Sequence, residues 1–546
     1  MDRKKRILLC CEASYLNTGY ATYGREVMKR LYQSGKYELA EFASYGDSND
    51  SRSNSIPWKF YGNSPDENNA REVEEYHKKG TNQFGEWKFE SVLLDFKPDI
   101  VFDVRDFWMI DFQERSPFRK FFHWVIMPTV DAAPQNEQWL ATYANADGVF
   151  TYSDWGHDIL KRESNGKINC LGSAPPSADS AYRPVSDRDQ HKVSMGLDPS
   201  IKIVGTVMRN QRRKLFPDLF AAFRKFLDTS NRDDVYLYCH TSYPDIGWDI
   251  PKLITQHGLS SRTIFTYVCT ECKNAFPAFF SDARTQCSAC GAYRAGLASV
   301  QNGVSYEFLS SVMNLFDLYI QYANSEGFGL PQVEAAACGV PVMSVDYSAM
   351  SSVIRKLKGE PLAIKGVYPE LETGCNRAIP DNDHTALKIE EFFNLSDSEK
   401  AKKGRECRVM FEKHYQWDTT AKKWADYFDN VKIKPDSQTW DSPPRIYAPS
   451  TEVPQNLPPN EYVRWLITSV LCEPDRLNSY MESRLIRDLN YGFYIEGTGG
   501  MYFNEDSMQF ARPQFEPFDM ETAYNSMLEL CSHRNVWEQR RAERIT

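Results

Sequence analysis

Residues 324–342 read NSEGFGLPQVEAAACGVPV, and this stretch decides how the surrounding region folds. The apolar run LFDLYIQYA (315–323) precedes it and is typical of a buried strand. Pro331 suits a helix start, where its missing N–H is no loss, and Gly339 suits the helix end. PVMSVD (341–346) then returns to a strand pattern. The stretch therefore predicts a strand–loop–helix–strand unit whose loop follows the carboxyl end of a strand.

The glycines and acids of this loop predict a binding site for an anionic ligand. Gly327 and Gly329 let the backbone approach a ligand closely, and the helix start adds partial positive charge that suits a diphosphate. Glu334, expected in the first helical turn, can accept hydrogen bonds from two vicinal hydroxyls such as those of a ribose. Glu326 would face whatever lies beyond the phosphates. The alternative is that Glu334 only complements the helix dipole and that Glu326 is a surface acid.

The rest of the chain alternates strands and helices in two series, joined by a polar, proline-containing linker at residues 177–200. This alternation predicts an α/β fold in which parallel sheets carry helices on both faces and ligands bind at the carboxyl ends of the strands. We assign residues 1–185 to a first domain and residues 186–431 to a second. Residues 432–546 form a C-terminal extension of unknown role, with helical patterns at 461–471 and 521–545.

The segment EGFGLPQVEAAACGVPV (326–342) closely resembles the E-x7-E signature of retaining glycosyltransferases of the family 4 type, the glycosyl transferases group 1. Three further stretches agree with that family in order and spacing: ADGVFTYSDWGHDIL (146–160), IVGTVMRNQRRKLFPDLFAAFRKF (203–226) and VSYEFLSSVMNLFDLYIQYA (304–323). The resemblance covers residues 5–431 and implies the GT-B fold, in which two Rossmann-like domains face a cleft. It also implies an acceptor-side first domain and a second domain that binds a nucleotide-sugar donor, a UDP- or GDP-sugar.

The same resemblance implies roles for individual residues. Glu334 would bind the donor ribose, and Glu326 would lie near the transferred sugar. The residues implied to hold the donor's diphosphate and sugar are Gly19, Arg209, Arg213, Lys214, Gly327, Phe328, Gly329 and Leu330. Fixed cations there would favour the transition state, because a leaving nucleoside diphosphate gains negative charge. Whether Arg209 or Arg213 works with Lys214 stays open.

Two residues, His123 and Asp131, compete for a further catalytic position after a central strand of the first domain. Asp131 is favoured because it follows Pro128 in a loop expected to face the cleft, whereas His123 is in the strand itself. The resemblance implies transfer with retention of anomeric configuration. An Asp-x-Asp pattern at residues 187–189 falls in the linker, so we expect no obligatory catalytic divalent metal.

The acceptor is left open between a glycan and a hydroxymethylated base in viral DNA. Two further functions remain as alternatives: a non-catalytic nucleotide-sugar-binding protein, and a nucleotide-sugar epimerase on the same fold. The first would keep the donor pocket without the chemistry, and the second would not be expected to carry this signature.

Four of the thirteen cysteines form two C-x-x-C pairs, Cys269 with Cys272 and Cys287 with Cys290. This spacing predicts a four-cysteine zinc ribbon at residues 266–294 with a structural zinc ion. The resembled family does not normally carry this element. It is either a stabilising insertion or a module that grips the acceptor, and Lys273, Arg284 and Arg294 lie in or beside it.

Composition describes an ordinary globular protein of more than one domain. The chain has 546 residues, of which 42% are hydrophobic and 25% charged, and its net charge of −10 gives no whole-protein argument for a polyanionic partner. No apolar run approaches the ~20 residues needed to span a bilayer. The apolar part of the N-terminus is short and is followed by Glu12, which indicates a strand rather than a signal peptide. Singly placed cysteines indicate a reduced, cytoplasmic protein. The oligomeric state is not indicated.

Overall fold

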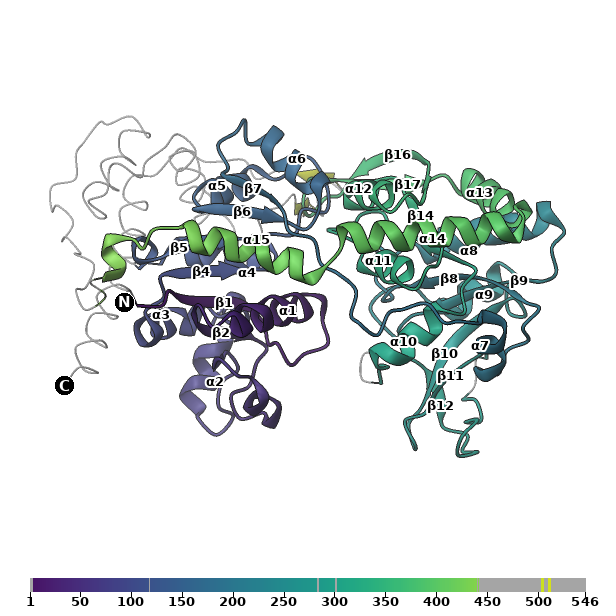
Figure 1. The fold of residues 1–546 in the computed structure, drawn as a ribbon, viewed down its shortest axis with the longest axis horizontal. Coiled ribbons are helices and arrows are strands. Elements are labelled where there is room, and N and C mark those ends of the chain that lie inside the picture. Colours follow the sequence, from purple (N-terminus) through teal and green to yellow (C-terminus); the bar gives the residue numbers. More distant parts are fainter. Residues whose placement is uncertain are drawn as a thin grey trace.

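The structure is a computed structural model that describes residues 3–116, 118–281, 284–299, 302–438 and 440, with two short strands at 502–504 and 509–511. The helices predicted at 461–471 and 521–545 lie outside the described residues. The chain forms two α/β domains that lie side by side (Figure 1). Among the helices of the described ranges, none is long and apolar enough to cross a membrane.

The first domain has a seven-stranded sheet in the order β3-β2-β1-β4-β5-β6-β7, with every neighbouring pair parallel. Its strands are β1 (Arg6–Glu12), β2 (Glu38–Ser44), β3 (Lys59–Gly62), β4 (Ile100–Asp103), β5 (His123–Ile126), β6 (Gly148–Thr151) and β7 (Cys170–Ser173). Its helices are α1 (Gly19–Ser34), α2 (Ala70–His77), α3 (Glu86–Phe96), α4 (Phe107–Glu114), α5 (Glu137–Ala144) and α6 (Asp154–Glu163), with short 3-10 turns at Ser51–Ser55, Gly80–Phe84 and Arg119–Phe121.

The second domain has an eight-stranded sheet in the order β11-β10-β9-β8-β13-β14-β15, with β12 paired to β10. Its strands are β8 (Lys202–Val207), β9 (Val235–His240), β10 (Thr263–Cys269), β11 (Ala275–Phe279), β12 (Ala295–Leu297), β13 (Leu318–Gln321), β14 (Val342–Val345) and β15 (Glu360–Leu362). A separate hairpin joins β16 (Ile364–Pro369) to β17 (Asn376–Pro380). The helices are α7 (Arg188–Ser194), α8 (Phe216–Ser230), α9 (Ile250–Gln256), α10 (Tyr306–Met313), α11 (Leu330–Ala337), α12 (Ser348–Lys356), α13 (Asn382–Asn394) and α14 (Asp397–His414).

The unit predicted from residues 324–342 is confirmed. β13 pairs with β14 in parallel, and α11 connects them. Because β13 lies between β8 and β14, the loops that follow β8 and β13 leave the same edge of the sheet side by side. We call residues 208–215, after β8, the basic loop and residues 322–329, after β13, the glycine loop. Lys214 forms a β-bridge with Ala323, which fixes the basic loop against the glycine loop. The fold thus brings together two segments that are about a hundred residues apart in the chain.

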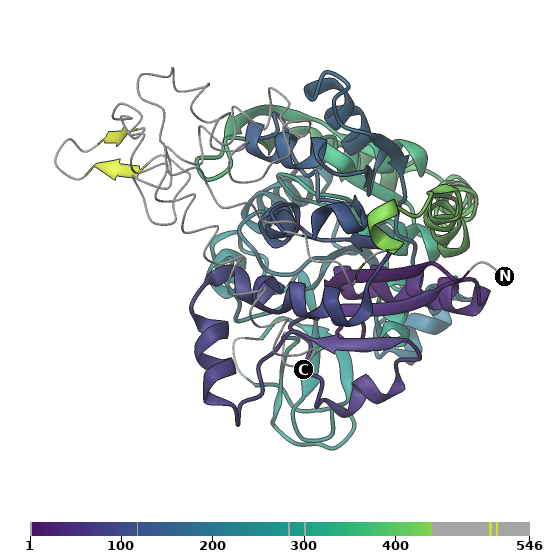
Figure 2. The same cartoon turned by 90° about the vertical axis from the view of Figure 1, so that its left-hand side faces the viewer.

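The chain returns to the first domain at its end. Helix α15 (Trp417–Asn430) continues beyond α14 and packs against α1 (Figure 1). Trp424, fully buried, stacks against Phe102 and Phe150 of the first sheet at ring distances of 5.1 and 4.5 Å. The prediction that residues 186–431 form the second domain is therefore wrong for α15. The 3-10 turn Pro435–Gln438 follows on the same side, while β18 (Tyr502–Asn504) and β19 (Gln509–Ala511) pair apart from both sheets (Figure 2).

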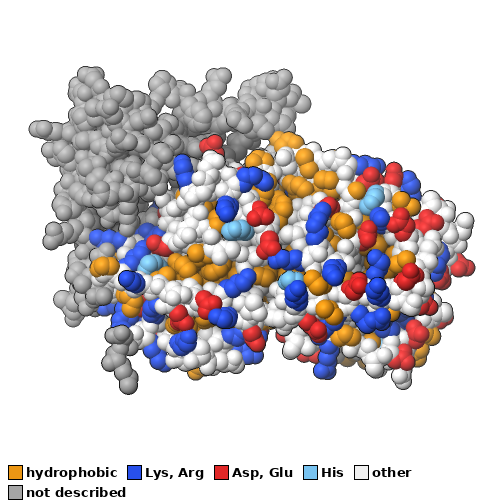
Figure 3. All heavy atoms as spheres, turned by 45° about the horizontal axis from the view of Figure 1, so that its top comes forward, with side chains coloured by type: hydrophobic (Ala, Val, Ile, Leu, Met, Phe, Trp, Pro, Cys, Tyr) orange, Lys and Arg blue, Asp and Glu red, His pale blue; other side chains and the backbone are white. Residues whose placement is uncertain are grey.

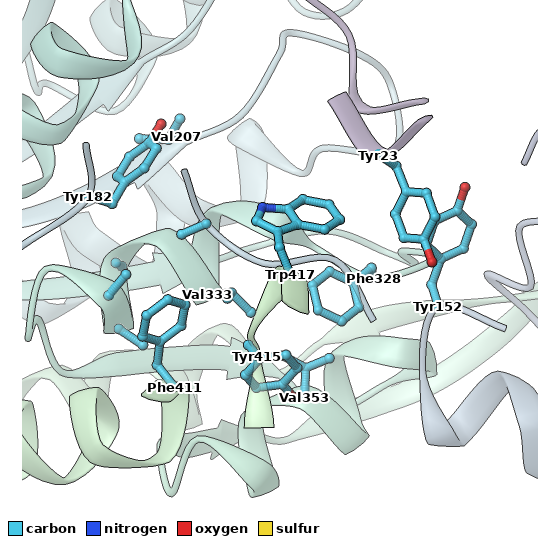
Figure 4. Close-up of a cluster of buried hydrophobic side chains, with 14 of the residues drawn as sticks. Tyr23, Tyr152, Tyr182, Val207, Phe328, Val333, Val353, Phe411, Tyr415 and Trp417 are labelled. Carbon is cyan, nitrogen blue, oxygen red and sulfur yellow. The ribbon is translucent and has the colours of Figure 1, made fainter. Parts of the chain in front are cut away.

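One apolar cluster is shared between the domains (Figure 4). Trp417 packs on Tyr23 of the first domain with ring centroids 5.5 Å apart, and Phe328 packs on Tyr415 at 5.7 Å. Phe328 belongs to the glycine loop. The loop is therefore anchored by apolar packing in the region where the domains meet.

Candidate active site

The glycine loop between β13 and α11 touches the first domain. A Cβ atom at Gly327 would lie 2.4 Å from Cγ2 of Thr129, which belongs to the loop after β5. Gly329 precedes α11 with φ of 81°, in the left-handed region that favours glycine. Gly327 therefore allows the loop to approach the first domain closely, and Gly329 allows the turn that precedes α11. Leu330 begins α11, so Glu334, its fifth residue, lies beyond the first turn in which the sequence placed it.

The acid of this loop, Glu326, is held by two cations from the loop after β8. Its Oε2 atom lies 2.6 Å from a guanidinium nitrogen of Arg213, and its Oε1 atom contacts the ammonium group of Lys214. Gln321 donates a hydrogen bond of 3.1 Å to the same Oε1 atom. Glu326 and Lys214 are both buried. Burial and the nearby Arg213 lower the pKa of Lys214, and Glu326 supplies the opposite charge.

Arg213, rather than Arg209, is the arginine beside Lys214. Arg209 is half exposed and pairs with Asp245 at 2.9 Å, away from Glu326. The guanidinium of Arg213 is partly exposed even though it contacts Glu326. The structure thus brings Arg213 and Lys214 together with the glycine loop and leaves Arg209 outside this group.

Glu334 lies in α11 with 6% of its surface exposed. Burial raises its pKa to about 7, and the hydroxyl of Tyr182 opposes this shift. The following residues, Ala335 to Ala337, are fully buried, so the helix packs closely on the sheet as predicted. Burial makes the Glu334 carboxyl costly to ionise. Carboxyl groups with pKa values perturbed in this way are common at functional sites.

Asp131 lies where the first domain meets the glycine loop. Its Oδ2 atom accepts hydrogen bonds from Arg377 of β17 at 2.8 Å and from the Ser325 hydroxyl at 3.3 Å. Arg377 also binds Glu370 at 2.5 Å. The sequence did not mark Arg377, because it lies in a hairpin well beyond the E-x7-E signature and carries no motif of its own.

The structure does not bring His123 to this group. His123 begins β5, and its Nε2 atom lies 2.6 Å from the carbonyl oxygen of Lys432. The loop with Asp131 leaves the opposite, carboxyl end of the same strand. The alternative of a catalytic His123 is therefore corrected: its imidazole belongs to the packing of the chain's return onto the first domain.

Gly19 begins α1 in the segment that follows β1, and a Cβ atom added to it would meet no described atom within 4 Å beyond its chain neighbours. Its neighbour Tyr20 reaches the domain interface, where its hydroxyl lies 2.8 Å from that of Thr129. Asp106, just after β4, also lies there: burial raises its pKa, whereas the hydroxyls of Tyr20 and Thr129 lower it. No motif marks Asp106 or Tyr20, since each follows an ordinary strand pattern.

Residues 297–400 match the family model described as "Glycosyl transferases group 1". Within this range the chain is similar to the glycosyl transferases group 1. The matched range includes the glycine loop, α11 and Arg377. Among curated proteins, a sequence search finds no match.

Several solved structures share the fold of this chain at low sequence identity. Sucrose-phosphate synthase from Thermosynechococcus elongatus is 16% identical with a TM-score of 0.55, covering 78% of this chain and 98% of that one. A glycosyltransferase from Rickettsia africae is 13% identical with a TM-score of 0.54, covering 78% and 98%. Anabaena Alr3699/HepE, solved with UDP and glucose, is 13% identical with a TM-score of 0.54, covering 78% and 100%. The predicted architecture of two Rossmann-like domains is confirmed, and the fold is GT-B.

The predicted cysteine group lies just before the matched group 1 range. The Sγ atoms of Cys269, Cys272, Cys287 and Cys290 all lie within 4.8 Å of one another. Cys269 and Cys290 are 3.8 Å apart, and Cys272 and Cys287 are 3.6 Å apart. A tetrahedral zinc ion with Zn–S bonds of about 2.3 Å separates its sulfur ligands by about 3.8 Å. The four thiols therefore fit a structural zinc ion.

Proposed function

We propose that the protein is a retaining glycosyltransferase that moves a sugar from a nucleotide-diphosphate sugar to an acceptor hydroxyl. The observation that carries this proposal is the pairing of Glu326 with Arg213 and Lys214 at the start of α11. Two cations that converge on one acid at the start of a helix are suited to hold the two negative charges of a diphosphate. The group 1 match and the UDP- and glucose-bound HepE neighbour support a nucleotide-sugar donor.

In this proposal, the second domain binds the donor and the first domain faces the acceptor. Arg213, Lys214 and the amino end of α11 stabilise the charge that develops on the departing diphosphate. The backbone from Gly327 to Leu330 holds phosphate and sugar oxygens, and Glu334 accepts hydrogen bonds from the ribose hydroxyls. Asp131 and Glu326 contact the transferred sugar. These roles favour the transition state because the leaving group is most charged there.

The four-cysteine ribbon is proposed to hold a structural zinc ion, since all four ligand positions are filled by protein thiols. Catalysis is expected without an obligatory divalent metal. Donor turnover measured with and without added Mg²⁺ and Mn²⁺, with zinc left in place, tests that expectation. A cytoplasmic location stays a prediction.

The test of the proposed function is a donor panel. Purified protein is incubated with UDP- and GDP-sugars, and release of nucleoside diphosphate is followed with and without an acceptor mixture. Transfer products are assigned by NMR, with the donor's anomeric configuration expected to be kept. An epimerase would convert the donor without releasing diphosphate, and a non-catalytic binding protein would bind the donor without consuming it.

A further inference from the structure

The hairpin of β16 and β17 lies between the glycine loop and the first domain. In β17, the backbone N–H of Ala378 donates a hydrogen bond of 3.0 Å to the carbonyl oxygen of Asn324 in the glycine loop. Two residues earlier, the N–H of Asn376 donates a hydrogen bond of 2.9 Å to the carbonyl oxygen of Ala133, in the loop after β5. Arg377 lies between these two residues, so its backbone is fixed at the boundary between the domains.

The guanidinium of Arg377 binds groups from both domains. One of its nitrogens, Nη1, donates hydrogen bonds to the carboxylate of Asp131 at 2.8 Å and to the hydroxyl of Ser325 at 2.5 Å. The other, Nη2, donates at 2.5 Å to the carboxylate of Glu370, in the connection between β16 and β17. Because a guanidinium holds its donors in a rigid planar fork, these bonds together fix the position of the Asp131 carboxylate.

Asp131 belongs to the first domain but is held by the second. Among the described residues, the donors to its carboxylate are Arg377 and the Ser325 hydroxyl, which lies 3.3 Å away. Both belong to the second domain, and Ser325 is part of the glycine loop. The orientation of this acid is therefore set across the interface.

Arg377 also differs from the charged side chains of the surface. Across the face shown in Figure 3, Lys and Arg side chains are interspersed with Asp and Glu. Exposed ion pairs contribute little on their own, because water and salt screen them. Arg377 is only 7% exposed and binds two carboxylates, so its charge is compensated and its side chain is held in one place.

Stability alone does not explain this arrangement. The Nε atom of Arg377 is buried and has no hydrogen-bond partner among the described residues. A buried donor without a partner is unfavourable, and a buried ion pair is often no more stabilising than apolar side chains of similar volume. The arrangement is better explained by the effect of Arg377 on Asp131, the acid proposed to contact the transferred sugar.

We propose that Arg377 is a positioning residue that holds the Asp131 carboxylate toward the glycine loop. This inference rests on the proposed function. The domain that binds the donor thereby also orients the acid that the first domain supplies, and Glu370 keeps the arginine in place. Because the cations proposed to hold the diphosphate are Arg213 and Lys214, loss of Arg377 affects the rate of transfer rather than the affinity for the donor.

The inference is tested with Arg377→Met, Asp131→Asn and the double variant. Wild type is incubated with a panel of UDP- and GDP-sugars, and the donor that is consumed fastest, by an acceptor or by water, is used for every variant. Release of nucleoside diphosphate gives kcat, and calorimetry gives donor affinity. We expect Arg377→Met to lower kcat about 10–100-fold, as for a misplaced catalytic group, with donor affinity within about 2-fold.

The double variant and a conservative variant separate positioning from a merely structural role. The double variant should be no slower than Asp131→Asn, because an arginine that acts through Asp131 has nothing to orient once that carboxylate is lost. Arg377→Lys, which keeps the charge, should recover part of the rate. If Arg377→Met does not fold, Arg377→Gln takes its place in the same comparison.

Lys356→Met is the matched control. Lys356 of α12 pairs with Asp154 of α6, so this ion pair also joins the two domains, but both side chains are more than a third exposed except that of Lys356, at 35%. The control should behave as wild type.

Three results would overturn the inference: an undiminished kcat in Arg377→Met, an equal loss in Lys356→Met, or losses that multiply in the double variant. A loss confined to donor affinity would do the same. Failure of the wild-type protein to bind any nucleotide sugar of the panel would instead overturn the proposed function.

Discussion

The environment of Lys214 differs strongly from that of an ordinary surface lysine. It is buried, and its ammonium group contacts Glu326 beside Arg213. A buried cation of this kind is retained only where something compensates its desolvation. Glu326 supplies that compensation in the structure, and the donor diphosphate would add to it in the proposed complex.

We therefore predict that Lys214→Met lowers kcat/KM for the nucleotide sugar by about 10²–10³-fold, since one fixed charge at the leaving group is lost. Steady-state kinetics on the active donor measure this. Lys225→Met is the control, because Lys225 is a half-exposed lysine on α8 that pairs with Asp383. Equal activity of Lys214→Met and wild type would contradict the assignment.

Gly327 sets how closely the domains approach. In Gly327→Ala the new Cβ atom would meet Cγ2 of Thr129 at 2.4 Å, so the loop or its partner must shift, at a cost of about 1–3 kcal/mol. We expect a lower free energy of unfolding by denaturant titration and a lower kcat. Thr129→Ser removes the clashing methyl group and keeps the hydroxyl, so the double variant should regain most of both losses. Additive losses in the double variant would show that the contact is not the cause.

The raised pKa of Glu334 predicts that the free energy of unfolding depends on pH. Its pKa is about 7 in the folded protein against about 4.3 in an unfolded chain, so its ionisation favours unfolding as pH rises through this window. Relative to wild type, Glu334→Gln should therefore gain up to about 3 kcal/mol in free energy of unfolding between about pH 4 and pH 8. Urea titrations at both pH values measure the difference. The same variant should bind UDP-sugar more weakly. A stability difference independent of pH would contradict the perturbed carboxyl.

The elements around the site show how far sequence reasoning reaches. The unit from β13 to β14 was predictable because Gly, Pro and an alanine run give each boundary a local cause. That Lys214 and the glycine loop belong to one site was predicted only through the family resemblance, and the pairing of Glu326 with Lys214 was not predicted. Arg377 could not be predicted, since it reaches Asp131 only through the packing of β17 against the loop after β5, which no local pattern encodes. His123 was the less favoured candidate, and it lies at the amino end of β5, where its ring contacts the carbonyl oxygen of Lys432.

The four-cysteine ribbon can be tested directly by its metal content. Cys269 ends β10 and Cys287 is buried, so the four thiols are bound into the sheet through β10, β11 and β12. We predict about one zinc ion per chain by mass spectrometry of the metal content, and its loss in Cys272→Ser with a lower melting temperature. Cys170→Ser, in β7 of the first domain, should keep the metal. Retention of zinc by Cys272→Ser, or absence of zinc in wild type prepared with the metal, would contradict the ribbon.

At the scale of the whole molecule, α15 and the shared apolar cluster connect the two sheets. The sequence does not say which sheet residues 417–430 cover, because both sheets offer apolar faces. The consequence is functional: Trp417 and Phe328 place the glycine loop against the first domain, so the proposed donor and acceptor groups come from different domains.

The central claim is that Arg213, Lys214 and the start of α11 form the site for a nucleotide sugar's diphosphate. The most direct measurement is a crystal structure of the protein with a bound UDP- or GDP-sugar. The account predicts the diphosphate in contact with Arg213 and Lys214, with Glu334 at the ribose hydroxyls. A nucleotide bound elsewhere, with Glu326 still paired to Lys214, would contradict it.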